Sequence, residues 1–417
     1  MLRSVLFSGL IIGAALVTPA FSDGENLPAD RLVSALLKSG FENLAVILED
    51  KHLIVTYENR RYRDELAAAE EVVSLVLALF SEEIEVTLIP QNRKIPLIAM
   101  TLTVNPNGAR PANGKSARAG ECSAMRVDLE FDSAWKKLQT LAPVNASTWK
   151  IDLVVHPQFH AVFGNYGNPV QSQINIAPAL NTSLWKGLSL CAQLIIPLQN
   201  ELEKEDDHVR PGLLTINQTL RLPRNVFASA SFGYFTKNRY GLDVETQKYF
   251  FNGKASIGAN FGYTGYASYS QGVWRYSTIE RLITLLNAEF RFPRVDLSLR
   301  ATYGKFLYQD IGWRVNLVRQ FREVDFGFFL MRSADEMNTG FHLSVPVFPR
   351  KHFPARALRI KTADYFPWEY RYKGIPDHGK LYNTGNHLED FMKRLNPSYV
   401  RNQIHYYQRW RNLEFFR

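Results

Sequence analysis

The sequence predicts a mainly β protein: an antiparallel outer-membrane β-barrel of roughly 12 strands that follows a small N-terminal α/β domain. Three observations predict this fold. The chain opens with an export signal, long stretches after residue 149 alternate between apolar and polar side chains, and no apolar run long enough for a membrane helix follows the first two dozen positions. Helices need such runs to cross a bilayer, whereas strands need only alternation.

Residues 1–22 have the three parts of a secretory signal peptide. Arg3 supplies a positive charge, Val5–Val17 form an apolar core, and Ala20-Phe21-Ser22 fit a cleavage site. We expect cleavage after Ser22. The stretch could instead remain as a single membrane anchor, but its short apolar core and its cleavage site favour removal. Because the chain is predicted to be exported, nucleic acid is not an expected partner.

The composition fits a folded chain with two regions in different surroundings. Hydrophobic residues make up 46% of the 417 residues and aromatic residues 13%, which excludes wholesale disorder. Residues 23–105 hold 14 acidic and 8 basic residues (net −6), whereas residues 201–417 hold 21 and 32 (net +11). A basic exported region suits lipid phosphates or an anionic polymer. Cys122 and Cys191 are too few for a disulfide scaffold, and the sequence leaves open whether they pair.

Residues 23–105 are predicted to form the α/β domain, and we expect it in the periplasm. A helix should end near Gly40, and a second should run from about Asp64 to Phe80, with apolar side chains every three or four positions. Four short apolar runs read as strands: "NLAVILED", "HLIVTYEN", "EIEVTLIP" and "IPLIAMTLTV". Nothing in this domain resembles a catalytic motif.

Residues 106–148 read as a linker with short elements, because "NPNGARPANGKSARAGEC" is rich in Gly, Pro, Asn and Ala. The β-barrel is predicted over residues 149–417, with a partly helical C-terminal segment. Turn formers such as Asn-Gly and Phe-Pro-Arg separate its alternating runs. These runs include "KIDLVVHPQFHAVFG", "VQSQINIAPALNTSLW", "GLSLCAQLIIPL", "GLLTINQTLRL", "VFASASFGYF", "TLLNAEFRF", "WRVNLVRQF", "EVDFGFFLMRS" and "TGFHLSVPVF".

The longest alternating run, "KASIGANFGYTGYASYS", covers residues 254–270 and indicates which face meets lipid. Apolar residues occupy one face of the strand: Ala255, Ile257, Ala259, Phe261, Tyr263, Ala267 and Tyr269. On the other face, Asn260 and Thr264 are candidates for the lumen. In "VDLSLRATY" the lumen candidates are Asp296 and Arg300, with Ser298 and Thr302, while Val295, Leu297, Leu299 and Ala301 would face lipid.

Alternation alone also fits a soluble sandwich or a lipocalin-like barrel, whose apolar faces point inward. Two features favour the membrane. The runs are commonly ten residues or longer, as a bilayer crossing requires, and aromatic residues lie near their ends. Those aromatic residues are Trp185, Trp274, Tyr276, Tyr303 and Trp313.

The segment "DYFPWEYRYKGIPDHGK", residues 364–380, is the best candidate for ligand contact. Aromatic rings can stack on sugars, and basic groups can bind carboxylate or phosphate substituents. The polysaccharide-binding candidates are Trp368, Tyr370, Arg371, Tyr372 and Lys373. The alternative, which the pattern favours, is an aromatic belt strand whose basic residues reach lipid headgroups.

Catalytic, metal and cofactor motifs were sought and none is predicted. The stretch "HLED", His387–Asp390, holds an imidazole and two carboxylates, but the pattern favours the first turn of a short helix with acids at its positive end.

Three stretches resemble the YjbH/GfcD-type family of Gram-negative outer-membrane proteins associated with exopolysaccharide: "GFENLAVILEDKHLIVTYENRRYRDEL", "IPQNRKIPLIAMTL" and "LEDFMKRLNPSYVRNQ". The resemblance implies a β-barrel with a role in exopolysaccharide export and carries over no catalytic residues. Members of this family are usually longer, with more than one barrel-like region. We therefore expect a shortened, single-barrel relative or one half of an assembly.

The function expected from these observations is that of an outer-membrane porin or secretion component for an anionic exopolysaccharide. Its partners would be outer-membrane lipid, the polymer and other polysaccharide-export proteins; no cofactor is expected. The rival hypothesis is an exported soluble β-rich enzyme, a lyase or hydrolase, with paired carboxylates in a groove. A purely structural barrel that anchors partners is a third possibility.

Overall fold

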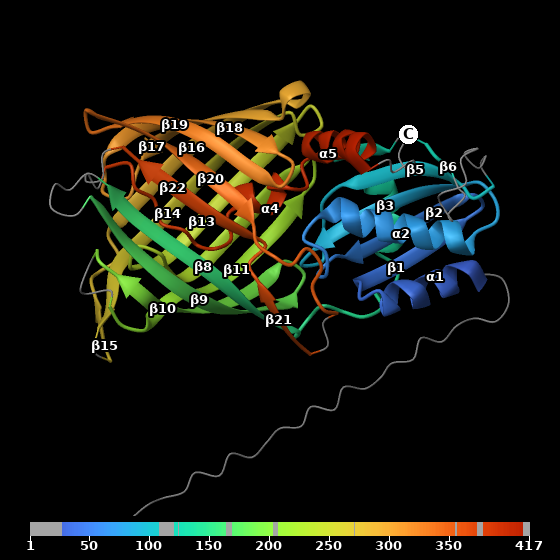
Figure 1. Ribbon diagram of the computed structural model, residues 1–417, viewed down its shortest axis with the longest axis horizontal. Helices are drawn as coiled ribbons and strands as arrows, with labels where there is room; N and C mark the ends of the chain where they lie inside the picture. Colours follow the sequence, from blue (N-terminus) through green and yellow to red (C-terminus); the bar gives the residue numbers. More distant parts are fainter. Residues whose placement is uncertain are drawn as a thin grey trace, which may run out of the picture.

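Two β-sheets organise the chain, one of seven strands and one of 15 (Figure 1). The computed structural model describes residues 27–107, 121–123, 125–163, 169–202, 207–270, 272–354, 357–372 and 378–411. The predicted signal peptide and the candidate Lys373 lie outside these residues.

The seven-stranded sheet belongs to the N-terminal part of the chain. Its strands and the neighbouring helices are α1 (Leu27–Lys38), β1 (Glu42–Glu49), β2 (His52–Glu58), α2 (Glu65–Leu79), β3 (Ile84–Asn92), β4 (Ile95–Pro96), β5 (Ala99–Asn105), β6 (Glu121–Cys122), β7 (Arg126–Asp128) and α3 (Asp132–Leu138). Helix α2 connects β2 to β3, and these two strands are parallel, as such a crossover allows. Up to β5 the order is helix, two strands, helix and three strands, because the stretch "IPLIAMTLTV", predicted as one strand, contains β4 and most of β5.

Helices cover both faces of this sheet. Helices α1 and α2 pack together on one face, over a core that includes Leu36, Val55 and Val73. Helix α3 lies on the other face, where Leu138 packs against Ile54 and Ile89. Strands β6 and β7 come from the stretch read as linker, and both pair with β5, so the sheet extends beyond residue 105.

The 15-stranded sheet forms the larger part of the molecule. Its strands are β8 (Ile151–Phe163), β9 (Val170–Trp185), β10 (Leu188–Asn200), β11 (Arg210–Leu222), β12 (Val226–Phe235), β13 (Arg239–Phe250), β14 (Ala255–Ser270), β15 (Val273–Tyr276), β16 (Arg281–Phe292), β17 (Leu297–Lys305), β18 (Ile311–Phe321), β19 (Val324–Ser333), β20 (Glu336–Pro346), β21 (Leu358–Thr362) and β22 (Tyr365–Arg371). The prediction of roughly 12 strands was too low, because β15 pairs only with β14 and because β21 and β22 are two short strands in sequence.

The sheet curls until its two edges come together (Figure 1). Strand β21 pairs in parallel with β8, the first strand, and β22 pairs antiparallel with β20. Only Ala363 and Asp364 separate β21 from β22. Ring contacts between Phe159 and Trp368, and between Phe163 and Tyr370, place the rest of β8 beside β22.

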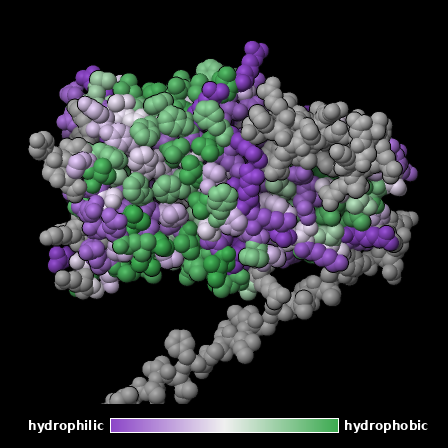
Figure 2. Space-filling model, viewed as in Figure 1, coloured by the Kyte–Doolittle hydropathy of each residue, from purple (hydrophilic) through white to green (hydrophobic). Residues whose placement is uncertain are grey.

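Apolar side chains cover the outside of this curled sheet, and polar ones line its inside. In β11, for example, Ile216 is 48% exposed, whereas its neighbour Asn217 is fully buried. Figure 2 shows hydrophobic residues over the outer surface of the sheet and hydrophilic ones near its junction with the N-terminal sheet. Exposed apolar residues include Ile174, Leu180, Leu194, Leu198, Ile216, Leu220, Phe232, Leu242, Ile257, Leu286, Phe290, Leu317 and Phe328. Buried polar residues include Gln173, Asn175, Gln193, Thr215, Asn217, Ser229, Ser231, Asp243, Gln247, Ser256, Thr264, Ser298, Thr302, Gln320 and Asp325. Most nonpolar strand side chains therefore lie outside. Inside the sheet, a smaller buried apolar cluster is formed by Phe235, Ile283, Leu285, Phe306, Leu307 and Tyr382.

Strand β14 follows the predicted alternation for only part of its length. Ile257, Phe261 and Tyr263 lie outside as expected, but Tyr266 is exposed and Ala267 is buried. The expectation for Ala267 was wrong because, beyond Thr264, β14 no longer pairs with β16 and pairs with β15 instead. The end of the strand thus leaves the main sheet and takes on different surroundings.

Strand β17 begins later than the alternation suggested. Leu299 faces outward and Ser298 inward, as predicted. Asp296, however, does not lie on the strand's lumen face. Pro293 starts a 3-10 turn, η2 (Pro293–Val295), and Asp296 ends it with a left-handed φ of +50°. Its carboxylate accepts a hydrogen bond from Asn402 Nδ2 of α5 at 2.5 Å. Asp296 therefore binds the helix at the end of the sheet and does not line the lumen.

After β22 the chain runs back through the interior of the curled sheet. We call residues 378–396 the strap; it includes the short helix α4 (Leu388–Lys393). At one end the Gly379 N–H donates to Asp310 Oδ2 at 2.7 Å, in the β17–β18 connection. At the other end Asn396 Nδ2 donates to the carbonyl of Gly253 at 2.8 Å, in the β13–β14 turn. Helix α5 (Pro397–Arg411) follows and lies between the two sheets (Figure 1).

The N-terminal sheet is fastened to the same end of the curled sheet as α5. Arg221 of β11 donates to the carbonyls of Pro96 and Leu97 at 3.0 Å and to that of Leu129 at 2.5 Å. Asn252, in the β13–β14 turn, donates to the Val127 carbonyl at 3.0 Å. The two sheets are therefore joined through hydrogen bonds to strand ends and tight turns.

Candidate functional site

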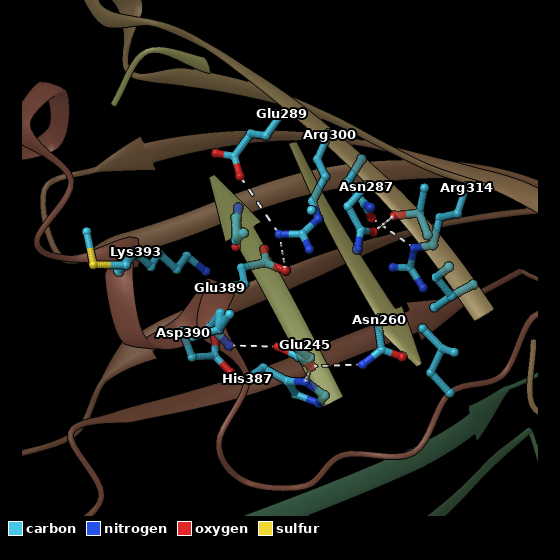
Figure 3. Close-up of a pocket in the computed structure, with 18 of the residues that line it drawn as sticks. Glu245, Asn260, Asn287, Glu289, Arg300, Arg314, His387, Glu389, Asp390 and Lys393 are labelled. Atoms are coloured by element: carbon cyan, nitrogen blue, oxygen red, sulfur yellow. Dashed lines mark hydrogen bonds and ion pairs between the residues drawn. The ribbon is translucent and has the colours of Figure 1, made fainter. Parts of the chain in front are cut away.

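A cavity of about 460 Å³ lies inside the curled sheet, between the strap and the inner faces of β13, β14, β16, β17, β18, β20 and β22. Figure 3 shows the polar side chains that project into it from the strands and from α4. Its charged lining residues are Asp243, Glu245, Glu289, Arg291, Arg300, Arg314, His342, Glu369, Arg371, His387, Glu389, Asp390 and Lys393. Amide side chains join them: Gln247, Asn260, Asn287, Asn316, Gln320, Asn383 and Asn396.

Tyr382 holds the strap near the end of the curled sheet that lies away from the N-terminal sheet, called the loop end below. Its hydroxyl donates to Asp243 Oδ2 at 2.6 Å, and its ring stacks on Phe235 with the centroids 5.2 Å apart. Gly262 of β14 faces the same hydroxyl, and a Cβ there would lie 1.9 Å from it. A glycine is thus required where the strap approaches the strand this closely.

The middle of the strap is held by His387 and the start of α4. His387 Nδ1 contacts Glu245 Oε1, and the Leu388 N–H donates to Glu245 Oε2 at 2.9 Å. The same carboxylate accepts from Asn260 Nδ2 at 3.3 Å. These contacts are drawn in Figure 3 and fix where the helix begins. The stretch "HLED" is therefore the start of a short helix, as predicted.

Ion pairs hold the remainder of α4 against the inner faces of the strands, called the wall below. Glu389 accepts from Arg300 at 2.7 Å, and Arg300 also lies 3.8 Å from Glu289 (Figure 3). Lys393 and Arg394 both reach Asp325 Oδ2 at 2.9 Å, and the Asp325 side chain is fully buried. Opposite charges compensate one another at each point, as buried charges require.

Across the cavity from α4, the wall holds a second charged group. Arg314 donates to Glu369 at 2.7 Å and to Asn316 at 2.9 Å, and Arg371 donates to the same carboxylate at 2.8 Å. Thr302 donates to Asn287 Oδ1 at 2.8 Å. The lining thus offers amide, guanidinium, carboxylate and hydroxyl groups, which can exchange hydrogen bonds with a hydroxyl-rich or charged ligand.

One side chain of the N-terminal sheet also reaches the strap. Arg93, in the β3–β4 turn, donates to Asn386 Oδ1 at 2.9 Å and to Asn217 Oδ1 of β11 at 3.1 Å. Asn386 also contacts Thr215 Oγ1 at 3.4 Å. The N-terminal unit, the wall and the strap therefore meet at one asparagine.

The predicted lumen residues lie in three different settings. Asn260 and Arg300 line the cavity. Thr264 is fully buried on the inner face of β14, outside the cavity lining. Asp296 lies in the turn described above.

The predicted polysaccharide-binding residues are divided between the two faces of β22. Arg371 faces the cavity with Glu369. Trp368 and Tyr370 lie on the other face, in ring contact with Phe341 of β20 and with β8. Tyr372 is 71% exposed beyond the strand. The structure does not bring these residues together into one site.

The strap and Arg93 are the parts of the site that sequence reasoning missed. Arg93 lies in "IPQNRKIPLIAMTL", and the second half of the strap, residues 388–396, lies in "LEDFMKRLNPSYVRNQ"; both stretches are quoted above for the family resemblance. The family resemblance of these stretches was the one sign in the sequence that they matter. Neither stretch carries a chemical motif that would have marked them as part of a site.

Metal-binding and membrane-helix features were sought in the part of the chain that the structure describes. Within it, no three or more His, Cys, Asp or Glu side chains group together as metal ligands would. The same residues include no helix that is both long enough and apolar enough to cross a membrane. Cys191, on β10, is a free thiol.

Comparisons with known proteins give one family match. Residues 14–347 match the family model YjbH, described as "Exopolysaccharide biosynthesis protein YbjH". No curated protein matches the chain. Among solved structures, the chain is similar to a loop L8 deletion mutant of OmpT, an outer membrane protein of Vibrio cholerae. That match has 8% identity and a TM-score of 0.24 and covers 46% of this chain and 86% of that one.

Proposed function

Since the chain belongs to the YjbH family of exopolysaccharide biosynthesis proteins, we propose that it is an outer-membrane β-barrel through which an exopolysaccharide passes or is guided. The N-terminal α/β domain lies in the periplasm in this proposal. Transport is passive, and the protein performs no catalysis.

The observation that carries the proposal is the orientation of the curled sheet. Removing apolar surface from water stabilises a folded protein by about 25 cal/mol per Å². If the outer strand faces were in water, the protein would lack this stabilisation over many strands. Placed in a bilayer, residues such as Ile216, Leu286 and Phe328 meet hydrocarbon, and the polar inner faces meet water. A soluble sandwich or lipocalin-like barrel would have the opposite arrangement.

Closure of the sheet is part of the proposal. Every backbone N–H and C=O in hydrocarbon needs an internal partner, so a membrane sheet has to close on itself. We propose that the stretch 358–371 is the seam: its first half pairs with β8 and its second half with β20.

The lengths of the connections support the orientation in the membrane. At the end that carries the α/β domain, turns as short as residues 186–187 and 322–323 join the strands. At the other end, the intervals between successive strands range from two residues, 334–335, to nine, 201–209. Outer-membrane barrels have short periplasmic turns and longer outer loops.

The cavity's carboxylates support passage rather than catalysis. Asp243 is engaged by Tyr382, Glu245 by His387, and Glu389 by Arg300. A general acid or base has to be available to the substrate, whereas these groups hold the strap. The basic balance of residues 201–417 supports an anionic polymer.

Several experiments test the proposal. The purified protein should keep a compact, faster-migrating band in SDS until it is heated, and in cells it should fractionate with outer membranes. Cells that lack it should secrete less exopolysaccharide. Recovery of a water-soluble monomer without detergent would exclude the barrel. Release of new reducing ends from candidate polymers would favour the enzyme instead.

A further inference from the structure

We propose that the strap, residues 378–396, is a gate that closes the conduit and leaves the wall when polymer passes. This inference rests on the proposed passage function and adds to it how passage is controlled. The contacts of the strap with the wall and with the α/β domain carry it.

The strap spans the interior from one end to the other. Its first contact, from Gly379 to Asp310, lies at the loop end of the sheet, and its last, from Asn396 to Gly253, lies at the end that carries the α/β domain. Between these two contacts, the strap occupies the part of the interior that the cavity does not. With the strap in place, a partly open cavity of about 460 Å³ remains between the strap and the inner faces of the strands.

Both apolar packing and polar contacts hold the strap. Leu388 and Met392 are buried in a hydrophobic core. Tyr382, His387 and Lys393 each bind a wall carboxylate: Asp243, Glu245 and Asp325, respectively. When such contacts break, water or polymer hydroxyl groups can replace them, so the net change in free energy for each is modest.

The strap is also tied to the α/β domain. Arg93 binds Asn386 at 2.9 Å, and the turn that carries it is itself fixed, because Glu58 accepts hydrogen bonds from the N–H groups of Arg93 and Lys94. A shift of the domain that withdraws Arg93 therefore removes one of the strap's anchors. Binding of a partner to the α/β domain in the periplasm can therefore open the gate by moving Arg93.

The first test pins the strap. Thr236 N–H donates to the Asn383 carbonyl at 3.1 Å, so the two backbones are adjacent at the loop end. A disulfide between Thr236→Cys and Asn383→Cys, made in a Cys122→Ser/Cys191→Ser background, holds the strap inside. In planar bilayers we expect the oxidised protein to conduct at least about tenfold less than the reduced protein. The control is Gln158→Cys/Asn175→Cys, which joins β8 to β9 in register and leaves the strap free.

The second test loosens the strap and follows its movement without reference to conductance. Arg93→Gln removes the anchor, and Lys94→Gln is its matched control. Thr384 is 1% exposed, so in the cysteine-free background Thr384→Cys should react with a membrane-impermeant thiol reagent only when the strap moves. We expect Arg93→Gln to increase both the labelling rate and the open probability several-fold, and Lys94→Gln to change neither.

The outcomes separate the gate from the conduit. Equal conductance in the oxidised and reduced pinned protein would refute the gate and leave the conduit standing. Faster labelling in Arg93→Gln, with zero conductance in every variant, would refute the conduit itself and favour a structural anchor.

Discussion

Arg221 joins the curled sheet to the N-terminal sheet. It donates three hydrogen bonds to carbonyls of Pro96, Leu97 and Leu129, and its guanidinium lies 4.2 Å from the Phe131 ring centroid. Lysine has the same charge, but its single ammonium cannot reproduce this planar fork.

We expect Arg221→Lys to weaken docking of the domain by about 1–3 kcal/mol, since buried carbonyls lose their donors. Limited proteolysis between the two sheets measures it, with faster cleavage as the expected result. Arg224→Lys, at an exposed position of the next turn, is the control. Equal cleavage rates for the two variants would mean that Arg221 does not hold the domain.

Glu65 makes the stability of the α/β domain depend on pH. It lies at the start of α2, and burial raises its pKa to about 8, an effect that Asn59 and Tyr57 only partly offset. In the unfolded chain the same carboxyl titrates near 4.5. Between these values the folded state binds more protons than the unfolded state, so stability falls as pH rises.

We therefore expect the domain to lose about 2–3 kcal/mol of stability between pH 6 and pH 9 through this group. In Glu65→Gln this part of the pH dependence should vanish, and Glu83→Gln, at an exposed position, should keep it. Urea unfolding of the full chain in detergent, followed by pulse proteolysis, measures the loss. A pH profile in Glu65→Gln that matches the unmodified protein would contradict the assignment.

At the scale of single strands, alternation was enough to predict which side chains face outward. Ile257 and Leu299 lie outside because a strand embedded in a regular sheet keeps its period of two residues. The prediction failed where the sheet is not regular: at Ala267, where β14 leaves its neighbour, and at Asp296, where Pro293 starts a turn. Local sequence does not state which strand pairs with which.

The strap could not have been predicted in the same way. It has no period of its own, since its residues are placed by partners far away in the sequence, such as Asp243 for Tyr382 and Glu245 for His387. Its one regular feature, the helix at His387–Asp390, was recognised from its first-turn acids. What those acids contact became clear only from the tertiary structure.

Two neighbouring residues of strand β16 can be used to test whether the outer surface of the curled sheet lies in lipid or in water. Leu286 is 60% exposed on the outer face, and the next residue, Asn287, faces the cavity. In a bilayer Leu286→Arg should cost about 2–4 kcal/mol at mid-depth, whereas Asn287→Arg meets water and other polar groups.

We expect Leu286→Arg to reduce the yield of heat-modifiable protein in outer membranes and Asn287→Arg to leave it nearly unchanged. A soluble protein would show the reverse, because an exposed arginine is harmless and one in the interior is not. Comparing the folded and unfolded bands of the two variants on a gel decides between these environments.

For the molecule as a whole, the proposed barrel depends on closure between strands far apart in the sequence. At the seam, Ile360 of β21 lies beside Leu153 of β8 in parallel register, and Ile360 is 63% exposed on the outer surface. Neighbouring strands bring Cα atoms within the range that a disulfide spans. Leu153→Cys/Ile360→Cys should therefore form a bond without distorting the sheet.

This bond would close a loop of about 200 residues, and long loops gain the most from a cross-link because the unfolded chain loses the most freedom. We expect the oxidised protein to be about 2–4 kcal/mol more stable than the reduced protein, and its folded band to persist to a higher temperature in SDS. The matched control, Leu153→Ala/Ile360→Cys, cannot form the bond and should not respond to oxidation. If the seam were open in solution, the paired cysteines would stay reduced or would link separate molecules, and the closed barrel would have to be abandoned.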